Sequence, residues 1–239
     1  MRVLAIETAT PRASVAVLGP QGILAEQSAS VSGGHLEWLM GAIAAVLADA
    51  GLAAGDIDAL VASIGPGGFM GLRVGAVTAS TWAMTGGRPV IGVSTLEVIA
   101  AGARDPAESS RALVLAAIDA RRGEVAAALF RCGPPAPAAL PERLTPDLLV
   151  APSEIRARLP ALTEQIIVVG DALERYQAVI TDALAPQATP AARERWWPRA
   201  SVGGTLGRAR LLRGDRDDPL RLVPRYAREP EAREFGPYP

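Results

Sequence analysis

A glycine-rich loop, GPGGFMG at residues 65–71, most constrains how this chain can fold. A β-prone run precedes it at residues 58–64, and a helix-compatible run follows it up to a Gly-Gly stop at residues 86–87. A strand, a glycine turn and a helix in this order place backbone N–H groups at a helix N-terminus, where an anion can bind. The loop has GxGxxxG spacing and no Walker lysine, so a tight turn that needs positive φ is the other interpretation.

Small residues recur every four positions along the helix after the loop and form one ribbon on its surface, at Gly71, Gly75, Ala79 and Ala83. A ribbon without bulk lets another helix approach closely. A second helix, predicted over residues 34–50, is apolar nearly all round, which indicates burial on both sides. We expect one side to cover a sheet and the other to meet a partner subunit. Burial beneath the second half of the same chain is the alternative.

The order of predicted elements indicates an α/β protein of two lobes. The first half has the order β-β-β-α-β-α-β-α, and the strand, polar turn and strand at residues 112–131 resemble its opening. We therefore predict an N-terminal lobe at residues 1–104 and a C-terminal lobe at 105–213. The tail at 214–239, rich in Arg, Pro and acids, is expected to be poorly ordered or to wrap a partner.

Residue types limit the chemistry that this chain can perform. It has one His, one Cys and no Lys, so two-histidine metal motifs and lysine catalysis are excluded. No GxSxG elbow is present. We therefore expect no catalytic residue and no metal site in this chain. The start lacks a signal-peptide pattern and no apolar run is long enough to span a membrane, so we expect a cytoplasmic protein with a net charge of −1.

A polar turn after the first predicted strand offers a second candidate for anion binding. The sequence Glu7-Thr8-Ala9-Thr10 places an acid and two hydroxyls where actin-like ATPases hold a magnesium–phosphate group. Those loops carry Asp and a Gly, whereas this one has Glu7 and no Gly. The candidate nucleotide-binding residues are Glu7, Thr8, Thr10, Gly65, Gly67 and Gly68.

Five blocks in order resemble the TsaB family, once labelled glycoprotease-like, which takes part in making threonylcarbamoyladenosine in tRNA. They are VLAIETATPRASVAV, HLEWLMGAI, IGPGGFMGLRVG, PVIGVSTLEVIA and AAIDARRGEV, within residues 2–130. LRLVPRYAREPE also looks like the family's tail. The resemblance implies an actin-like ATPase (ribonuclease H-like) fold, with two related lobes of mixed sheets flanked by helices.

The resemblance also implies a role and partners. The family member is a non-catalytic scaffold for the paralogue TsaD, which carries the metal and the active site, and a small ATPase, TsaE, joins them. No cofactor is then expected in this chain, with ATP and metal on the partner subunits, and tRNA is reached through the complex. In the family, the helices matching residues 34–50 and 71–86 face TsaD, or a second copy in its absence. The implied interface residues are His35, Leu36, Leu39, Met40, Ile43, Gly71, Val74, Gly75, Thr78, Ala79, Trp82 and Ala83.

The chain departs from the family pattern in the glycine loop and in the turn after the first predicted strand. The family loop is usually GPGSFTG, but Gly68 and Met70 replace its hydroxyl residues, and Glu7 replaces an Asp. These changes weaken phosphate binding and leave the small-residue ribbon intact.

Two other functions remain as alternatives to the scaffold role, namely a stand-alone ATPase or kinase of the same fold, and a glycopeptidase. Whether the Arg-rich stretch 193–233 touches tRNA is open.

Overall fold

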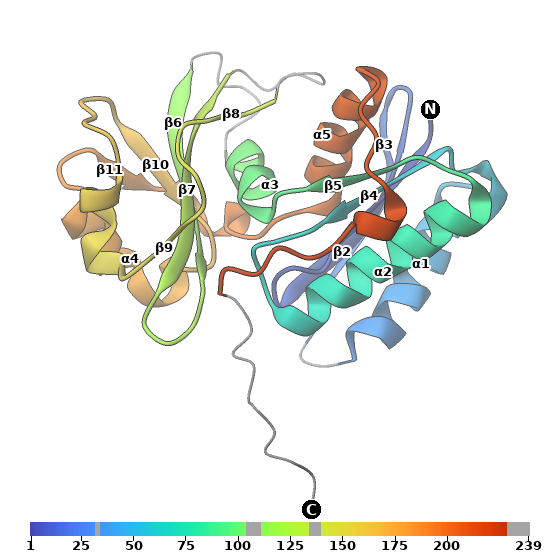
Figure 1. Ribbon diagram of the computed structural model, residues 1–239, viewed down its shortest axis with the longest axis horizontal. Helices are drawn as coiled ribbons and strands as arrows, with labels where there is room; N and C mark the ends of the chain where they lie inside the picture. The colour runs from blue at the N-terminus through green and yellow to red at the C-terminus, as the bar shows by residue number, and fades with distance from the viewer. Residues whose placement is uncertain (32–33, 104–110, 134–139, 229–239) are drawn as a thin grey trace, which may run out of the picture.

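The computed structural model describes residues 1–31, 34–103, 111–133 and 140–228, which form two lobes around two mixed sheets (Figure 1). The first sheet has the strand order β3-β2-β1-β4-β5. Its strands are β1 (Val3–Glu7), β2 (Arg12–Gly19), β3 (Gly22–Ser30), β4 (Ala59–Ser63) and β5 (Val90–Val93). β1 pairs antiparallel with β2 and parallel with β4, so its residues lie at the centre of the sheet.

The second sheet repeats this arrangement. Its order is β11-β10-β6-β7-β8, with β9 also paired to β7. The strands are β6 (Ala112–Asp119), β7 (Val125–Cys132), β8 (Glu142–Arg143), β9 (Leu148–Val150), β10 (Ile166–Val169) and β11 (Ala188–Pro190). β6 pairs antiparallel with β7 and parallel with β10, as β1 does with β2 and β4. The predicted actin-like fold of two related lobes is confirmed.

Helices cover both faces of the first sheet because alternate strand residues point to opposite sides. Leu4 and Ile6 of β1 pack with α1 (His35–Asp49) and α2 (Phe69–Gly86). Val3 and Ala5 pack with α5 (Ala200–Leu212) on the other face. Between the two sheets lies α3 (Thr95–Gly102), which contacts β6, β7 and α5 (Figure 1).

The other helical elements of the described residues are α4 (Leu173–Ala183) and four 3-10 helices. The second lobe has α4, which packs against the short helix η2 (Pro152–Arg158). The remaining 3-10 turns are η1 (Ala54–Asp56), η3 (Arg193–Arg195) and η4 (Pro219–Arg221). η2 is a 3-10 helix of seven residues, and the short strand β11 lies within the Pro- and Ala-rich stretch 186–198.

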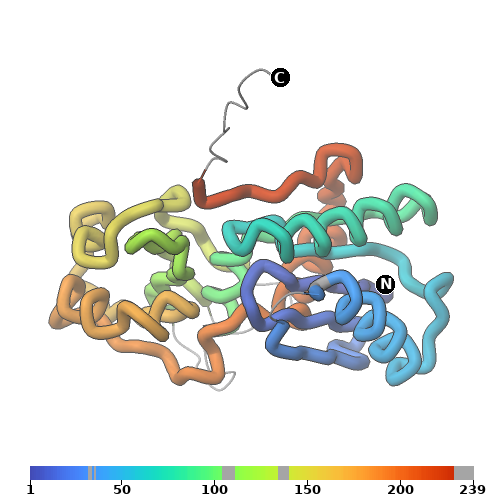
Figure 2. The backbone as a smooth tube through the Cα atoms, turned by 90° about the horizontal axis from the view of Figure 1, so that it is seen from below, coloured from blue at the N-terminus to red at the C-terminus, as the bar shows by residue number. Residues whose placement is uncertain are grey.

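Two boundaries differ from the sequence prediction. Residues 200–212, assigned to the C-terminal lobe, form α5 on the first sheet, where a Cβ at Gly204 would overlap Leu18 and one at Gly207 would overlap Val61. Residues 214–228, expected to be poorly ordered or to wrap a partner, run along α2 from β5 toward the second lobe (Figure 2). Residues 229–239 of the predicted tail lie outside the described residues.

Candidate functional site

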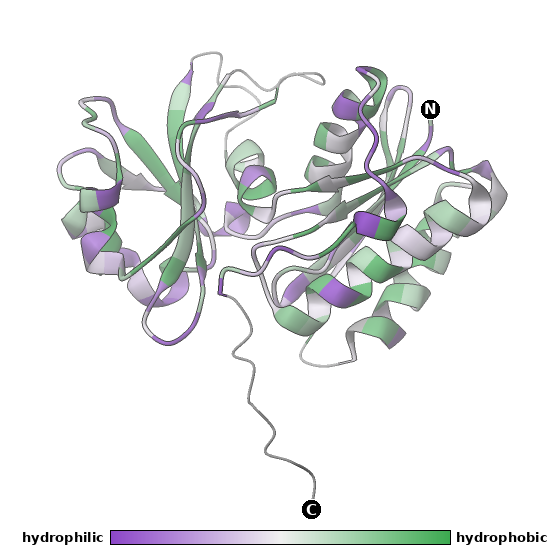
Figure 3. Cartoon of the chain, in the orientation of Figure 1, coloured by the Kyte–Doolittle hydropathy of each residue, from purple (hydrophilic) through white to green (hydrophobic). Residues whose placement is uncertain are grey.

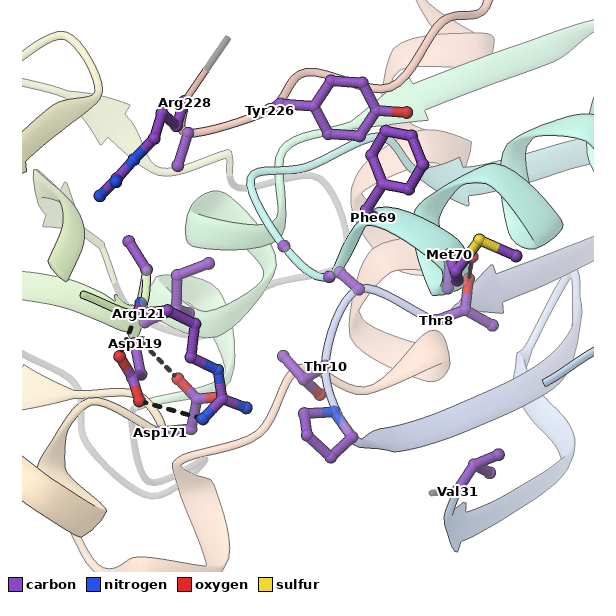
Figure 4. Close-up of a pocket in the computed structure, with 18 residues that line it drawn as sticks. Thr8, Thr10, Val31, Phe69, Met70, Asp119, Arg121, Asp171, Tyr226 and Arg228 are labelled. Atoms are coloured by element: carbon purple, nitrogen blue, oxygen red, sulfur yellow. Dashed lines mark hydrogen bonds and ion pairs between the residues drawn. The ribbon is translucent and has the colours of Figure 1, made fainter. Parts of the chain in front are cut away.

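A cleft of about 400 Å³ lies between the two lobes (Figure 4). The turn after β1 and the N-terminus of α2 form its first-lobe wall, and the ends of β6 and β10 form the opposite wall. Residues 226–228, at the end of the segment 214–228 that we call the C-terminal segment, lie at the edge of the cleft. The principal side chains around it are Thr8, Thr10, Phe69, Asp119, Arg121, Asp171, Tyr226 and Arg228.

Two carboxylates meet on the second-lobe wall because β6 and β10 are parallel neighbours. Asp119 ends β6 and Asp171 follows β10, and the Asp119 N–H donates to Asp171 Oδ1 at 3.0 Å. Arg121 Nη1 lies 3.5 Å from Asp119 Oδ2. Burial raises the pKa of the Asp171 carboxyl to about 6, and repulsion from Asp119 adds to the rise. At neutral pH the Asp171 carboxyl is therefore largely charged, and the Arg121 guanidinium lies beside the pair.

Glu7 does not face the cleft. Its side chain is 1% exposed, and its Oε1 accepts the Ala9 N–H at 2.8 Å while its Oε2 accepts the Ser63 hydroxyl. Burial raises the pKa of the Glu7 carboxyl to about 7, although both hydrogen bonds act in the opposite direction. Glu7 therefore ties β1 to β4 and does not reach a ligand between the lobes.

The raised pKa of Glu7 predicts a pH dependence of stability. Unfolded Glu7 releases its proton near pH 4.5 and folded Glu7 near pH 7, so stability falls as pH rises between these values. The full effect is about 3 kcal/mol above pH 7. We expect Glu7→Gln to flatten this slope in urea unfolding at pH 5, 6, 7 and 8, with the part that remains below pH 6 arising from Asp171. Glu37→Gln, an exposed site on α1, should keep it. Equal slopes in both variants would contradict the assignment.

The two predicted phosphate loops pack on each other. Gly68 N donates to the Ala9 carbonyl at 2.7 Å, and a Cβ at Gly67 would lie 2.7 Å from Ala9 Cβ. The hydroxyls of Thr8 and Thr10 donate to the carbonyls of Gly71 and Arg12 at 2.8 and 3.0 Å. These donors are thus engaged within the chain, and the loops do not fit the phosphates of a nucleotide in this arrangement.

The six predicted nucleotide-binding residues are only partly brought together. Thr8, Thr10, Gly67 and Gly68 line the cleft, and Glu7 and Gly65 are not among its lining residues. Gly65, at φ +111°, lies under the Arg225 carbonyl, which a Cβ would overlap. Its conformation and its close contact explain the glycine at this position, in line with the turn interpretation.

The small-residue ribbon of α2 faces the chain's own sheet, which corrects the sequence interpretation. A Cβ at Gly75 would overlap Thr8 Oγ1 and lie 3.3 Å from Ile6 Cγ2. Gly71, Ala79 and Ala83 are buried as well. The lack of bulk therefore lets α2 lie close over β1 and its following turn, and it does not admit a helix of another subunit.

Only some of the predicted interface residues are accessible. Leu39 and Ile43 are buried in the core beneath α1 with Gly71, Gly75, Ala79 and Ala83 of α2, so these six cannot face a partner. Val74, Thr78 and Trp82 are half-buried. Leu36 and Met40 are 56% and 54% exposed. His35 opens α1, and its side chain lies outside what the structure describes.

The outer faces of α1 and α2 form an apolar surface, which we call the helix face. It comprises Leu36 and Met40 of α1 with Met70, Val77 and Met84 of α2, all more than half exposed. Figure 3 shows both helices largely in white and green. Three of the four methionines of the chain are in this set. Methionine side chains adapt to irregular surfaces and are frequent where proteins bind one another.

The helix face continues beyond α2. In Figure 2, α2 lies between α1 and the C-terminal segment, and η4 contacts α2. Leu220 and Val223 of that segment are 73% and 65% exposed, whereas Leu222 between them is buried in the core. The apolar surface on this side of the first lobe thus spans three neighbouring elements.

Sequence reasoning missed the second-lobe wall of the cleft and the C-terminal side chains at its edge. Asp119 ends the buried strand β6 and Asp171 lies two residues after the buried strand β10, and that signal could have placed them together at one sheet edge. Tyr226 and Arg228 carry no such signal. Among the described residues, no group of three or more His, Cys, Asp or Glu could hold a metal ion. In the same residues, no helix has the length and hydropathy needed to cross a bilayer.

Comparison with known proteins relates both lobes to one family. Residues 3–136 match the family described as "TsaD: tRNA N6-adenosine threonylcarbamoyltransferase". The chain is 28% identical to the Bacillus subtilis tRNA threonylcarbamoyladenosine biosynthesis protein TsaB, over 97% of this chain and 96% of the relative. It is 41% identical to the Escherichia coli TsaB over 52% of this chain and 53% of the relative. The solved structure of YeaZ from Pseudomonas aeruginosa matches with a TM-score of 0.80 at 25% identity, over 94% of this chain and 99% of that one.

Proposed function

The chain belongs to the TsaB family of tRNA threonylcarbamoyladenosine biosynthesis proteins, and we propose that it is the non-catalytic scaffold of the modifying complex. In this proposal it binds and supports a TsaD-like paralogue, which transfers the threonylcarbamoyl group to adenosine 37 of tRNA. A TsaE-like ATPase joins the two. ATP and metal belong to these partners, tRNA is reached through the complex, and the assembly acts in the cytoplasm.

The exposed helix face is the observation that carries the proposal. Its five side chains are more than half exposed although all are large and apolar. Large apolar side chains that gather exposed on two neighbouring helices favour a protein-binding site. An interface of standard size buries about 800 Å² on each partner, which two helices and a neighbouring segment can supply. Without the paralogue, the same face can pair with a second copy of the chain.

The residue types of the chain favour a supporting role over catalysis. Its single histidine excludes the paired-histidine metal sites that the old glycopeptidase label would require. Glu7, the acid of the polar turn predicted to bind phosphate, is held by Ser63 and Ala9 within the first lobe. Stoichiometric zinc or iron in the purified chain would revive the peptidase interpretation.

A stand-alone nucleotide-binding enzyme is the second candidate. Asp119, Asp171 and the N-terminus of α2 do face the cleft, and carboxylates with a helix N-terminus can hold a magnesium–phosphate group. Binding would require the hydrogen bonds between the two phosphate loops to rearrange. Calorimetry of the isolated chain with ATP and Mg²⁺ separates the candidates, because micromolar affinity would favour the enzyme.

Reconstitution of the modification tests the proposed function. The TsaD-like paralogue, the TsaE-like ATPase and unmodified tRNA are incubated with ATP and threonylcarbamoyl-adenylate, with and without this chain. Mass spectrometry of digested tRNA then measures threonylcarbamoyladenosine. We expect the product only when the chain is present. The same yield without the chain would contradict a supporting role.

A further inference from the structure

We propose that residues 224–228 form a latch that binds across the edge of the cleft and holds the two lobes in one relative orientation. These residues follow η4 and reach from the first lobe to the second. In two-lobed proteins, hinge motion about the connections is the default expectation unless further contacts oppose it. The latch supplies such contacts on both lobes.

The latch is anchored to the first lobe by its backbone and by one aromatic ring. Arg225 N donates to the Ile64 carbonyl at 2.6 Å, and the Arg225 carbonyl lies over Gly65, where only a residue without Cβ leaves room. The Tyr226 ring lies 5.0 Å from that of Phe69. The Tyr226 hydroxyl accepts a hydrogen bond from Arg73 Nε at 3.1 Å. The latch therefore binds the glycine loop and the first turn of α2.

The second-lobe end of the latch makes one polar and one apolar contact. Arg228 Nη2 donates to Glu124 Oε2, and both side chains are about one-third exposed. Ala227 packs against the second-lobe core. Leu222, just before the latch, belongs to the first-lobe core under α1 and α2. The six residues 222–227 thus join the two hydrophobic cores.

The turn that carries Glu124 is shaped to meet the latch. Arg121 and Arg122 have φ of 63° and 54°, a left-handed conformation that costs free energy for residues with a Cβ. Glu124 N donates to the Arg121 carbonyl at 3.1 Å, and Ala120 N donates to the Glu124 carbonyl at 3.0 Å. This tight turn directs Glu124 toward Arg228, so opening the cleft would separate the pair.

Hydrogen–deuterium exchange of the full chain tests the latch. In Arg228→Met and in Glu124→Gln, peptides covering residues 65–69 and 119–124 should exchange about tenfold faster, the effect of losing a charge-assisted hydrogen bond. The double variant should exchange no faster than either single one, since both remove the same contact. Arg221→Met is the control, because Arg221 is 87% exposed and pairs with Asp218 on its own segment. Unchanged exchange in Arg228→Met, or an equal rise in Arg221→Met, would overturn the proposal.

The distance between the lobes provides an independent readout. Spin labels at Ala53→Cys in the first lobe and Val179→Cys in the second lie at exposed sites, and the native Cys132 is buried. Pulsed electron resonance should give one narrow distance distribution for the intact chain and a broader one after Arg228→Met. A broad distribution in the intact chain, or an unchanged narrow one in the variant, would show that the latch does not hold the lobes.

Discussion

Replacing Leu36 and Met40 together by Asp is expected to abolish the complex with the TsaD-like paralogue and to leave the chain folded. Both side chains are more than half exposed, so the folded monomer tolerates the carboxylates. In the complex the same carboxylates would be buried without partners, which costs several kcal/mol for each desolvated charge. We expect at least a 100-fold loss of affinity, or about 2.7 kcal/mol, in titration calorimetry.

A matched control separates this surface from general effects of added charge. Val179 on α4 is 43% exposed on the other lobe, so Val179→Asp introduces the same group outside the helix face. It should leave the affinity unchanged. If the Leu36→Asp, Met40→Asp chain unfolds at the wild-type temperature and still binds the paralogue with wild-type affinity, then the helix face is not the docking surface.

Substituting Gly75 by Leu is expected to unfold the chain or to destabilise it severely, with loss of partner binding as a consequence. If the ribbon met a partner helix, this variant would fold and fail to bind, but the ribbon faces β1. Even a Cβ at Gly75 overlaps Thr8 Oγ1, and a leucine would also meet Ile6. Overpacking here should cost about 3 kcal/mol or more. For a chain of this length, thermal unfolding should then shift down by about 6–12 °C.

Gly41 on α1 is the control for glycine replacement. Its added Cβ would have no neighbour within 4 Å, and its position is exposed and helical. Gly41→Ala should therefore stabilise the chain by about 0.5–1 kcal/mol through reduced backbone freedom in the unfolded state. A Gly75→Leu chain with wild-type thermal stability would show that α2 does not lie on the sheet as described.

Most elements of the fold follow from local sequence patterns. The apolar runs within residues 3–18 and the glycine stops at residues 51 and 87 place strands and helices within two residues of their observed ends. The helix predicted from residue 71 begins at Phe69, since the loop continues directly into its first turn. Such local signals depend on backbone conformation and on which side chains are apolar. Residues close together in the sequence determine both properties.

The candidate site depends on contacts between distant residues, and sequence patterns left these open. The periodicity of residues 71–83 shows that a close neighbour is needed, but β1 and a partner helix satisfy it equally well. Asp119 and Asp171 meet only because β10 inserts beside β6. Tyr226 belongs to a polar stretch whose composition is typical of disorder, yet the backbone contact of Arg225 with Ile64 and the burial of Leu222 hold that stretch on α2.

Co-purification of the tagged chain with the TsaD-like paralogue from the same cell tests the scaffold role most directly. The full chain is captured at native expression level, and the eluate is analysed by sedimentation and mass spectrometry. We predict a stable complex of the two proteins in equal amounts, which is lost in the Leu36→Asp, Met40→Asp chain. Wild-type chain that elutes alone, with the paralogue fully active in the unbound fraction, would contradict this account.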